Sequence, residues 1–310
     1  GGTRVMCGTS GGGFDLMTEA LSLSAMTEIP FVCVIAQRPG PATGAPTMTA
    51  QGDLNLAVFA GHGEFPRIVL ALSDPTDAFY LTAKALNLAD KYQTPVLLLT
   101  DKYLAESNFS IPKYEISKVE VDRGKVLTEG DNSKLRFDYS EDGISPRWFP
   151  GDKIATFLAN SDEHSPKGYS TEDNSEIEKM MQKRLLKEKT IMNDIPEPEI
   201  TGDPKTADLS VISWGSNKQV IKDVLSELEK NGKTFAILHF TYIWPLKTEK
   251  LSQYIKEAKK SVVIELNATG QLAELIKRQT GLEDVGQKIL KHDGRPFTFE
   301  ELKTMILSII

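Results

Sequence analysis

The sequence predicts an α/β protein with two parallel-sheet domains joined by an irregular, charged connector. Short and continuously apolar runs at residues 31–35 and 96–99 are typical of strands buried on both faces of a parallel sheet. Amphipathic helical patterns alternate with these runs, and this order places helices on both faces of such a sheet. A length of 310 residues favours two domains over one. We expect the domains at 1–116 and 207–310 and the connector at 117–206.

The first domain carries four strand signals, at residues 4–8, 31–35, 67–72 and 96–99. Asp15 is the expected N-cap of the helix that follows the first strand. Asp74 before Pro75 is the pattern of an N-cap with proline in the first helical turn. The apolar spacing that follows predicts an amphipathic helix that ends near Tyr92.

The connector differs from the regular domains on either side of it. Its charges are dense and its turn residues frequent, so we expect a solvated segment with one helix at 175–189 and linkers at 195–199 and 202–204. Regular alternation returns with strands at 208–213, 234–239 and 261–265. Ser216 is the expected N-cap of the next helix, and Thr298 with Glu301 predicts a capping box for the last one.

Charge and cysteine content exclude several classes of function. A net charge of -7 argues against a broad basic face for nucleic acid and against attraction to anionic membranes. No apolar stretch is long enough to span a membrane. Cys7 and Cys33 form no CxxC pair, so we expect no metal or iron–sulfur site within this chain and a reducing, cytoplasmic setting. Without an initiator Met, and with a strand signal almost at once, the chain is expected to start inside a domain.

Two polar segments follow neighbouring strands: residues 9–13, the glycine turn, and residues 38–53, the Arg38 loop. In open parallel sheets ligands bind beyond the carboxyl ends of strands, so both segments are expected at one edge. The glycine turn lacks the Lys-Ser/Thr of a nucleotide-binding P-loop and the last glycine of GxGxxG. Two interpretations stay open: a turn that joins strand to helix, or a backbone that approaches a flat ligand beside Thr9 and Ser10.

Arg38 is the strongest candidate for ligand binding, although an exposed arginine is usually solvent-facing. Its planar guanidinium can pair with a carboxylate through two hydrogen bonds. Pro39 and Pro41 restrict the backbone that follows. Three threonines could orient the same anion: Thr43, Thr47 and Thr49. Gln51 and Asp53 are either supporting partners or turn residues, and the sequence does not separate the two.

Other polar residues have structural explanations that compete with functional ones. His62 lies between glycines, where a turn residue is more common than a catalytic base. Glu64 and Asp101 stand at element ends, and the histidines show neither catalytic-triad order nor metal-ligand spacing. Asn267 precedes a helix expected at 271–279; it either caps this helix or helps to bind an anion at its start.

Several motifs resemble the alpha subunit of 2-oxoacid:ferredoxin oxidoreductases, especially the 2-oxoglutarate type. The similarity covers nearly the whole chain and is weakest over 117–206. The pairing of the Arg38 loop with the Asn267 motif is its most specific feature. The motifs are Thr9-Ser-Gly-Gly-Gly-Phe14, Gln37-Arg-Pro-Gly-Pro-Ala-Thr-Gly44, Gly61-His-Gly-Glu-Phe-Pro-Arg67, Asn267-Ala-Thr-Gly-Gln-Leu272 and Lys291-His-Asp-Gly-Arg-Pro-Phe297.

The resemblance implies a thiamine diphosphate enzyme that oxidatively decarboxylates a 2-oxoacid with coenzyme A, forms an acyl-CoA and reduces ferredoxin. Residues 1–116 would form the pyrimidine-binding domain and residues 207–310 a transketolase C-terminal-like domain. Arg38, as the catalytic residue, would hold the substrate carboxylate with help from Thr43. Thr9, Ser10 and Gly11 would line the cofactor pocket.

The resemblance also implies a hetero-oligomer. A beta subunit would supply the Mg²⁺ and diphosphate site and an iron–sulfur cluster, neither of which this sequence provides. Two departures are visible: Ser10-Gly-Gly-Gly13 replaces the usual Ser-Gly-Pro-Gly, and the family's Tyr-Pro-Ile-Thr-Pro loop and cofactor-activating glutamate are absent. We therefore expect the 310 residues to be inactive alone. The alternatives are a pyruvate or branched-chain/indolepyruvate enzyme, another transketolase-like component such as a dehydrogenase E1, and a non-catalytic scaffold subunit.

Overall fold

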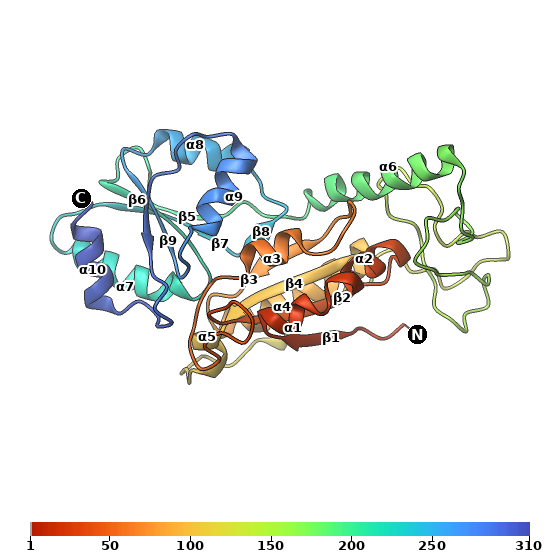
Figure 1. The fold of residues 1–310 in the computed structure, drawn as a ribbon, viewed down its shortest axis with the longest axis horizontal. Helices are drawn as coiled ribbons and strands as arrows, with labels where there is room; N and C mark the ends of the chain where they lie inside the picture. The colour runs from red at the N-terminus through yellow and green to blue at the C-terminus, as the bar shows by residue number, and fades with distance from the viewer. Residues whose placement is uncertain (1) are drawn as a thin grey trace.

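The computed structural model describes residues 2–310 and contains two open, mostly parallel sheets (Figure 1). Their strand orders are β1-β2-β4-β3-β8 and β10-β9-β6-β7-β5. The first sheet consists of β1 (Met6–Thr9), β2 (Phe31–Gln37), β3 (Ile68–Ala71), β4 (Pro95–Asp101) and β8 (Tyr242–Trp244). The second consists of β5 (Glu199–Thr201), β6 (Leu209–Trp214), β7 (Phe235–Phe240), β9 (Ser261–Glu265) and β10 (Gln287–Leu290). The predicted α/β class is confirmed.

Helices cover both faces of the first sheet because its central strands are apolar on both sides. In β2, Val32 packs into one core and Cys33 into the opposite one, and Val96 and Leu97 of β4 divide in the same way. The Cys33 side is covered by α1 (Gly11–Asp15), α2 (Thr18–Thr27) and α3 (Leu54–Phe59), and the Val32 side by α4 (Pro75–Tyr92). The short α5 (Lys102–Glu106) follows β4 directly.

The second sheet is also covered on both faces. One face packs against α7 (Lys218–Glu229) and α10 (Phe299–Leu307), and the other against α8 (Glu249–Glu257) and α9 (Gln271–Thr280). The core on the second of these faces is continuous with the core under α1 and α3, so Phe14 and Leu272 belong to one apolar cluster. The two sheets therefore share a hydrophobic core.

Each sheet ends in a short antiparallel strand that the sequence did not predict. β8 pairs antiparallel with β3, and residues 242–244 thereby complete the first sheet. β5 pairs antiparallel with β7, although residue 199 was expected in a linker. Strands of three residues are too short to show an apolar alternation, which is the signal that strand prediction uses. The domain limits of 1–116, 117–206 and 207–310 stay a prediction.

Two predicted N-caps are wrong. Asp15 is the last residue of α1, which already begins at Gly11, because the fully buried Phe14 draws the glycines into a helical turn against the core. Ser216 lies in the short 3-10 helix η2 (Gly215–Asn217), and its hydroxyl donates to the Asp101 carboxylate instead of capping α7.

The other two predicted caps are confirmed. The Asp74 carboxylate accepts a hydrogen bond from the Asp77 backbone N–H at 2.8 Å, with Pro75 in the first turn of α4. Thr298 and Glu301 form the reciprocal capping box at the start of α10.

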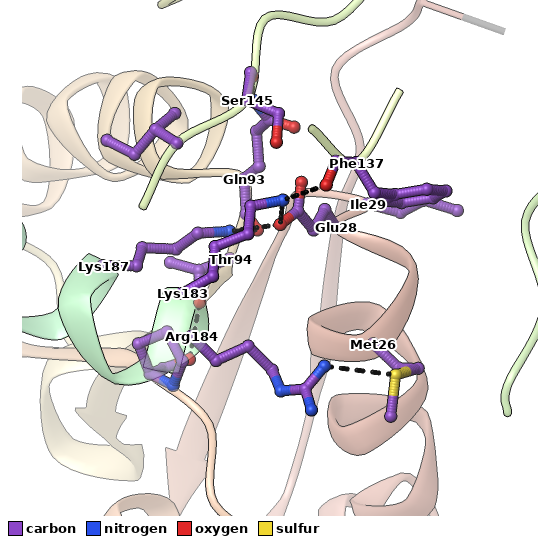
Figure 2. A network of polar contacts seen from close by, with 12 residues as sticks. Met26, Glu28, Ile29, Gln93, Thr94, Phe137, Ser145, Lys183, Arg184 and Lys187 are labelled. Carbon is purple, nitrogen blue, oxygen red and sulfur yellow. Dashed lines mark hydrogen bonds and ion pairs between the residues drawn. The ribbon is translucent and has the colours of Figure 1, made fainter. Parts of the chain in front are cut away.

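The connector is attached to the first domain by a buried ion cluster around Glu28 (Figure 2). The Glu28 carboxylate lies 2.9 Å from Lys183 Nζ, 3.3 Å from Lys187 Nζ and 3.1 Å from Arg136 Nη1. Burial alone would raise the pKa of Glu28, but the three cations hold it well below its ordinary value.

The three cations of this cluster belong to the connector, and both lysines lie on α6 (Asn174–Ile191), close to the predicted helix at 175–189. The expected solvated connector is therefore buried against its neighbour at this cluster. Lysines and arginines resemble surface residues in a sequence, and only the fold brings Glu28 opposite them. Elsewhere the connector is largely irregular, with one more short 3-10 helix, η1 (Ile116–Lys118), at its start.

The longest helices, α4 and α6, have 18 residues each and carry charged side chains such as Lys84 and Glu178. Among the helices formed by residues 2–310, none is both long enough and apolar enough to cross a membrane.

Gln51 joins the Arg38 loop to the second domain through hydrogen bonds at both ends of its buried side chain. Its amide Nε2 donates to the Trp214 carbonyl at 2.9 Å, and its Oε1 accepts from Asn217 Nδ2 and from the Leu266 backbone N–H, each at 2.9 Å. Its backbone N–H donates to the Leu266 carbonyl at 2.7 Å, and its carbonyl accepts from Asn267 Nδ2 at 3.1 Å. The position of the loop thus depends on both domains.

Replacing Gln51 with Ala is expected to destabilise the contact between the two domains. The change leaves three buried polar groups unpaired, at a cost of about 1–3 kcal/mol for each group that finds no water. Denaturant unfolding should show the loss. Gln219→Ala is the matched control, because Gln219 is exposed on α7 and bonds only to Asp223. Equal stability of the two variants would contradict this account of the interface.

Replacing Glu28 with Gln is expected to lower the free energy of unfolding by about 3–5 kcal/mol, because it leaves three buried cations without their carboxylate. The exposed pair of Glu115 and Lys118 provides the control, since Glu115→Gln should cost no more than about 1 kcal/mol.

The free energy of unfolding of the wild type is expected to depend on pH through Glu28. A lowered pKa means that the Glu28 contribution is present above its ordinary value of 4.5 and declines as the pH falls below that value. In Glu28→Gln this part of the acid dependence should be missing.

Candidate functional site

The candidate site lies at the carboxyl ends of β1 and β2. These strands are parallel neighbours with Thr9 opposite Ile35, so the glycine turn and the Arg38 loop leave the sheet at one edge. A Cβ atom added at Gly12 would lie 3.3 Å from the carbonyl oxygen of Ala42. The predicted proximity of the glycine turn to the Arg38 loop is therefore confirmed.

Each glycine of the turn lies against a different neighbour. A Cβ atom at Gly11 would lie 2.6 Å from Asp53 Oδ1, and one at Gly13 would collide with the Thr9 hydroxyl. Ser10 precedes α1 in extended conformation, and its side chain makes no capping hydrogen bond to the helix. The turn is thus more than a flexible joint, because no side chain fits on any of its glycines without displacing a neighbour. The roles of Thr9, Ser10 and Gly11 toward a cofactor stay a prediction.

Arg38 is half-buried at the base of a loop that folds back on itself. The Ala45 N–H donates to the Pro39 carbonyl at 3.0 Å, and Gly44, at a φ of 55°, approaches the same carbonyl so closely that only glycine fits. Within residues 2–310 no carboxylate forms an ion pair with the guanidinium, although it lies near enough to Asp53 to influence that carboxyl electrostatically.

The three threonines of the loop do not share one role. Thr43 and Thr47 are exposed, and the substrate-binding role of Thr43 stays a prediction. Thr49 is buried, and its hydroxyl accepts a hydrogen bond from the Tyr103 N–H at 3.2 Å while its own N–H donates to the Gly294 carbonyl at 2.9 Å. The expectation that Thr49 helps to orient an anion is therefore wrong, because its polar groups hold the loop in place.

Asp53 places its carboxyl group against Gly11 of the glycine turn. Burial, and then the nearby Asp15 carboxylate, raise its pKa to about 6, while Arg38 partly opposes the shift. Its Oδ2 atom is buried and has no hydrogen-bond partner within residues 2–310. The sequence left open whether Asp53 is a turn residue or a supporting partner, and the structure places it against the glycine turn.

Three other candidates have structural roles or lie in exposed turns. Asp101 is buried and accepts a hydrogen bond from the Leu104 N–H at 3.0 Å at the start of α5, and burial raises its pKa. His62 lies in an exposed turn bonded to Ser22, as the turn interpretation predicts. Glu64 is exposed in the same turn.

Asn267 supports the start of α9 as the capping interpretation expects, but the N-cap residue itself is Gly270. The Asn267 Oδ1 accepts from the Gly270 N–H at 2.7 Å. The first free N–H groups of α9, those of Leu272 and Ala273, donate to the buried Glu265 carboxylate at 2.9 and 3.1 Å. An anion at this helix start would meet a carboxylate already in place, so the anion-binding alternative is wrong.

Two residues that shape the site were missed or undervalued by sequence reasoning. Glu265 was assigned only to a strand, although a charged residue at the end of an apolar strand and before a helix was a visible signal. Gly294 packs against Met48 of the Arg38 loop, and its positive φ of 85° gives no signal in a sequence. Over residues 2–310 no group of three His, Cys, Asp or Glu side chains could hold a metal ion.

Sequence comparison identifies two family regions along the chain. Residues 1–183 match the family described as "Pyruvate flavodoxin/ferredoxin oxidoreductase, thiamine diP-bdg". Residues 207–302 match "Pyruvate:ferredoxin oxidoreductase core domain II". The first region alone covers more than half of the residues.

Curated relatives in sequence belong to the same family of oxidoreductases. The alpha subunit of 2-oxoacid:ferredoxin oxidoreductase 1 from Sulfurisphaera tokodaii is 41% identical over 314 residues, which is 100% of this chain and 49% of the relative. The 2-oxoglutarate synthase subunit KorA from Methanothermobacter thermautotrophicus is 29% identical over 311 residues, with 99% of this chain and 81% of the relative covered. The chain spans about half the length of the curated relatives it matches first.

Solved structures were compared with this chain by fold. The 2-oxoglutarate:ferredoxin oxidoreductase from Magnetococcus marinus, with 2-oxoglutarate, coenzyme A and succinyl-CoA bound, has a TM-score of 0.93 at 33% identity over 99% of this chain and 53% of that one. A split-gene transketolase shares only the fold, with a TM-score of 0.50 at 11% identity over 98% of this chain and 75% of that one. The family regions, the relatives and the fold agree with the resemblance in the motifs, and the chain belongs to the alpha subunits of the 2-oxoacid:ferredoxin oxidoreductase family.

Proposed function

We propose that this chain is the part of an alpha subunit that binds the carboxylate of a 2-oxoacid, with 2-oxoglutarate as the best candidate, in a ferredoxin-reducing oxidative decarboxylation. The observation that carries the proposal is the half-buried Arg38 guanidinium, without an ion-pair partner among residues 2–310 and near the Asp53 carboxyl, which itself lies against the glycine turn. Charged bidentate pairing with a carboxylate both binds the substrate and fixes its orientation. Thr43 on the same loop is proposed to assist.

The residues of the glycine turn fit one side of a thiamine diphosphate site. The turn presents backbone without side chains at Gly11 and Gly12, with Thr9 and Ser10 half-buried beside it. When bound, this cofactor supplies the carbanion chemistry that breaks the bond to the carboxylate carbon. The residues of this chain would bind and orient the substrate and exclude water from the site.

The remaining functions are assigned to partners. We propose a hetero-oligomer in which a beta subunit provides the Mg²⁺ and diphosphate site and the iron–sulfur cluster. In the reaction a 2-oxoacid and coenzyme A become an acyl-CoA and carbon dioxide, and the electron pair passes to ferredoxin. Support for 2-oxoglutarate comes from the names of two relatives, the 2-oxoglutarate synthase subunit and the solved 2-oxoglutarate enzyme. A cytoplasmic location stays a prediction from the two free cysteines.

Replacing Arg38 with Ala in the complete assembly is expected to raise the KM for the 2-oxoacid about 30-fold or more. Truncating one partner of a buried charge pair costs roughly 2–5 kcal/mol. The measurement is 2-oxoacid-dependent viologen reduction. Arg278→Ala is the control, since Arg278 is exposed on α9 and stacks on Phe59. Unchanged kinetics in Arg38→Ala would remove Arg38 from the site, and turnover of pyruvate in preference to 2-oxoglutarate would change the assigned substrate.

A further inference from the structure

Asp53 occupies the N-cap position of α3 but does not cap that helix. An aspartate in this position usually accepts a hydrogen bond from an N–H group in the first helical turn. Here the carboxylate lies against the glycine turn instead, with its Cγ atom 2.7 Å from where a Gly11 Cβ would be. Helix formation therefore does not explain the direction of this side chain.

The side chain of Gln37 fixes the backbone of Asp53. The Asp53 backbone N–H donates to Gln37 Oε1 at 3.0 Å, and Gln37 Nε2 donates to the Thr100 carbonyl at 3.2 Å. Gln37 is buried and directly precedes Arg38. Asp53 is thus fixed beside the base of the loop, while its buried Oδ2 has no partner within residues 2–310. An ionised oxygen that is buried without a partner is costly, so this environment favours the protonated form of Asp53.

The charges around this position are unbalanced. Two charged groups are near enough to influence the Asp53 carboxyl: Asp15 on α1, which favours its protonated form, and Arg38 on the loop, which favours its ionised form. From α9 the facing residue is the neutral Gln271, whose Nε2 donates to the Gly52 carbonyl at 2.8 Å. Two carboxyl groups therefore stand opposite one guanidinium. With both ionised, an anionic substrate approaches a net negative site.

We propose that Asp53 takes up a proton from solvent when a 2-oxoacid carboxylate binds to Arg38, and thereby sets the pH range in which the site accepts its substrate. The inference rests on the proposed function, because it assigns the anion at Arg38 to a 2-oxoacid. Pairing with substrate removes the cation that favours the ionised Asp53 and adds a like charge, and both effects favour the protonated form.

The sign of the pH dependence follows from this linkage. Burial and Asp15 place the pKa of Asp53 at about 6 in the empty site. Substrate raises it further, so binding takes up protons between the pKa of the empty site and that of the occupied site. Affinity is expected to increase as the pH falls from 8.5 toward 6 and to level off below that.

The test uses the complete alpha–beta assembly with its cofactor. Glutarate serves as the probe, because it carries the carboxylates of 2-oxoglutarate but no keto group to react. Calorimetric titration in two buffers with different heats of ionisation counts the protons taken up per glutarate. The KM and kcat for 2-oxoglutarate across the same pH range give the second readout.

Wild type is expected to take up a proton fraction that rises toward one near the middle of this range. Asp53→Asn should abolish the uptake, flatten the pH dependence of the KM and improve affinity at pH 8 by about tenfold, since one like charge is gone. Asp15→Asn is the matched variant; it should keep the uptake but move it to lower pH. A merely structural role for Asp53 would not produce a gain in affinity.

Two results would overturn the inference: no proton uptake by wild type, or the same uptake in Asp53→Asn. Asp53→Ser replaces the amide variant if Asp53→Asn does not fold, and the same criteria apply to it. Failure of the proposed function is distinguishable, because then wild type would show no 2-oxoacid-dependent viologen reduction at any pH.

Discussion

The geometry of the site depends on the hydrogen bonds that Gln51 makes to the second domain. The Arg38 loop leaves the first sheet at the end of β2 and returns at Gln51, whose amide is bound by Trp214, Asn217 and Leu266. A second tie, from the Thr49 N–H to the Gly294 carbonyl, fixes the same side of the loop. The guanidinium is therefore placed by both domains together, and either domain alone would leave the loop attached at one end.

The remainder of the interface combines apolar packing with buried hydrogen bonds. His239 of the second sheet bonds to Ser73 Oγ at 2.7 Å and to Ser213 Oγ at 2.9 Å. Burial is the main factor that lowers the pKa of His239 to about 3, so it stays uncharged at physiological pH. Buried groups that are fully paired rigidify a structure, and a rigid frame is what precise placement of substrate requires.

Buried charged groups are fully paired at one end of the first sheet and incompletely paired at the other. Beside the connector, Glu28 is surrounded by three cations and every oxygen of its carboxylate is paired. At the ligand edge, Asp53 keeps an oxygen without a partner and Arg38 has no ion pair within residues 2–310. Unsatisfied groups of this kind are expected where a protein is built to meet a ligand. The contrast supports the proposal that Arg38 and Asp53 serve a ligand, while Glu28 serves the fold.

The order of strands and helices, the covering of both sheet faces and the meeting of the glycine turn with the Arg38 loop follow from the sequence, because apolar runs and cap residues act over a few neighbouring positions. Tertiary structure alone decided the antiparallel edge strands, the buried cluster at Glu28 and the roles of Gln51 and Asp53. Each of these joins residues far apart in the chain. A polar side chain looks the same in sequence whether it faces water or a buried partner, and only the packed fold determines which.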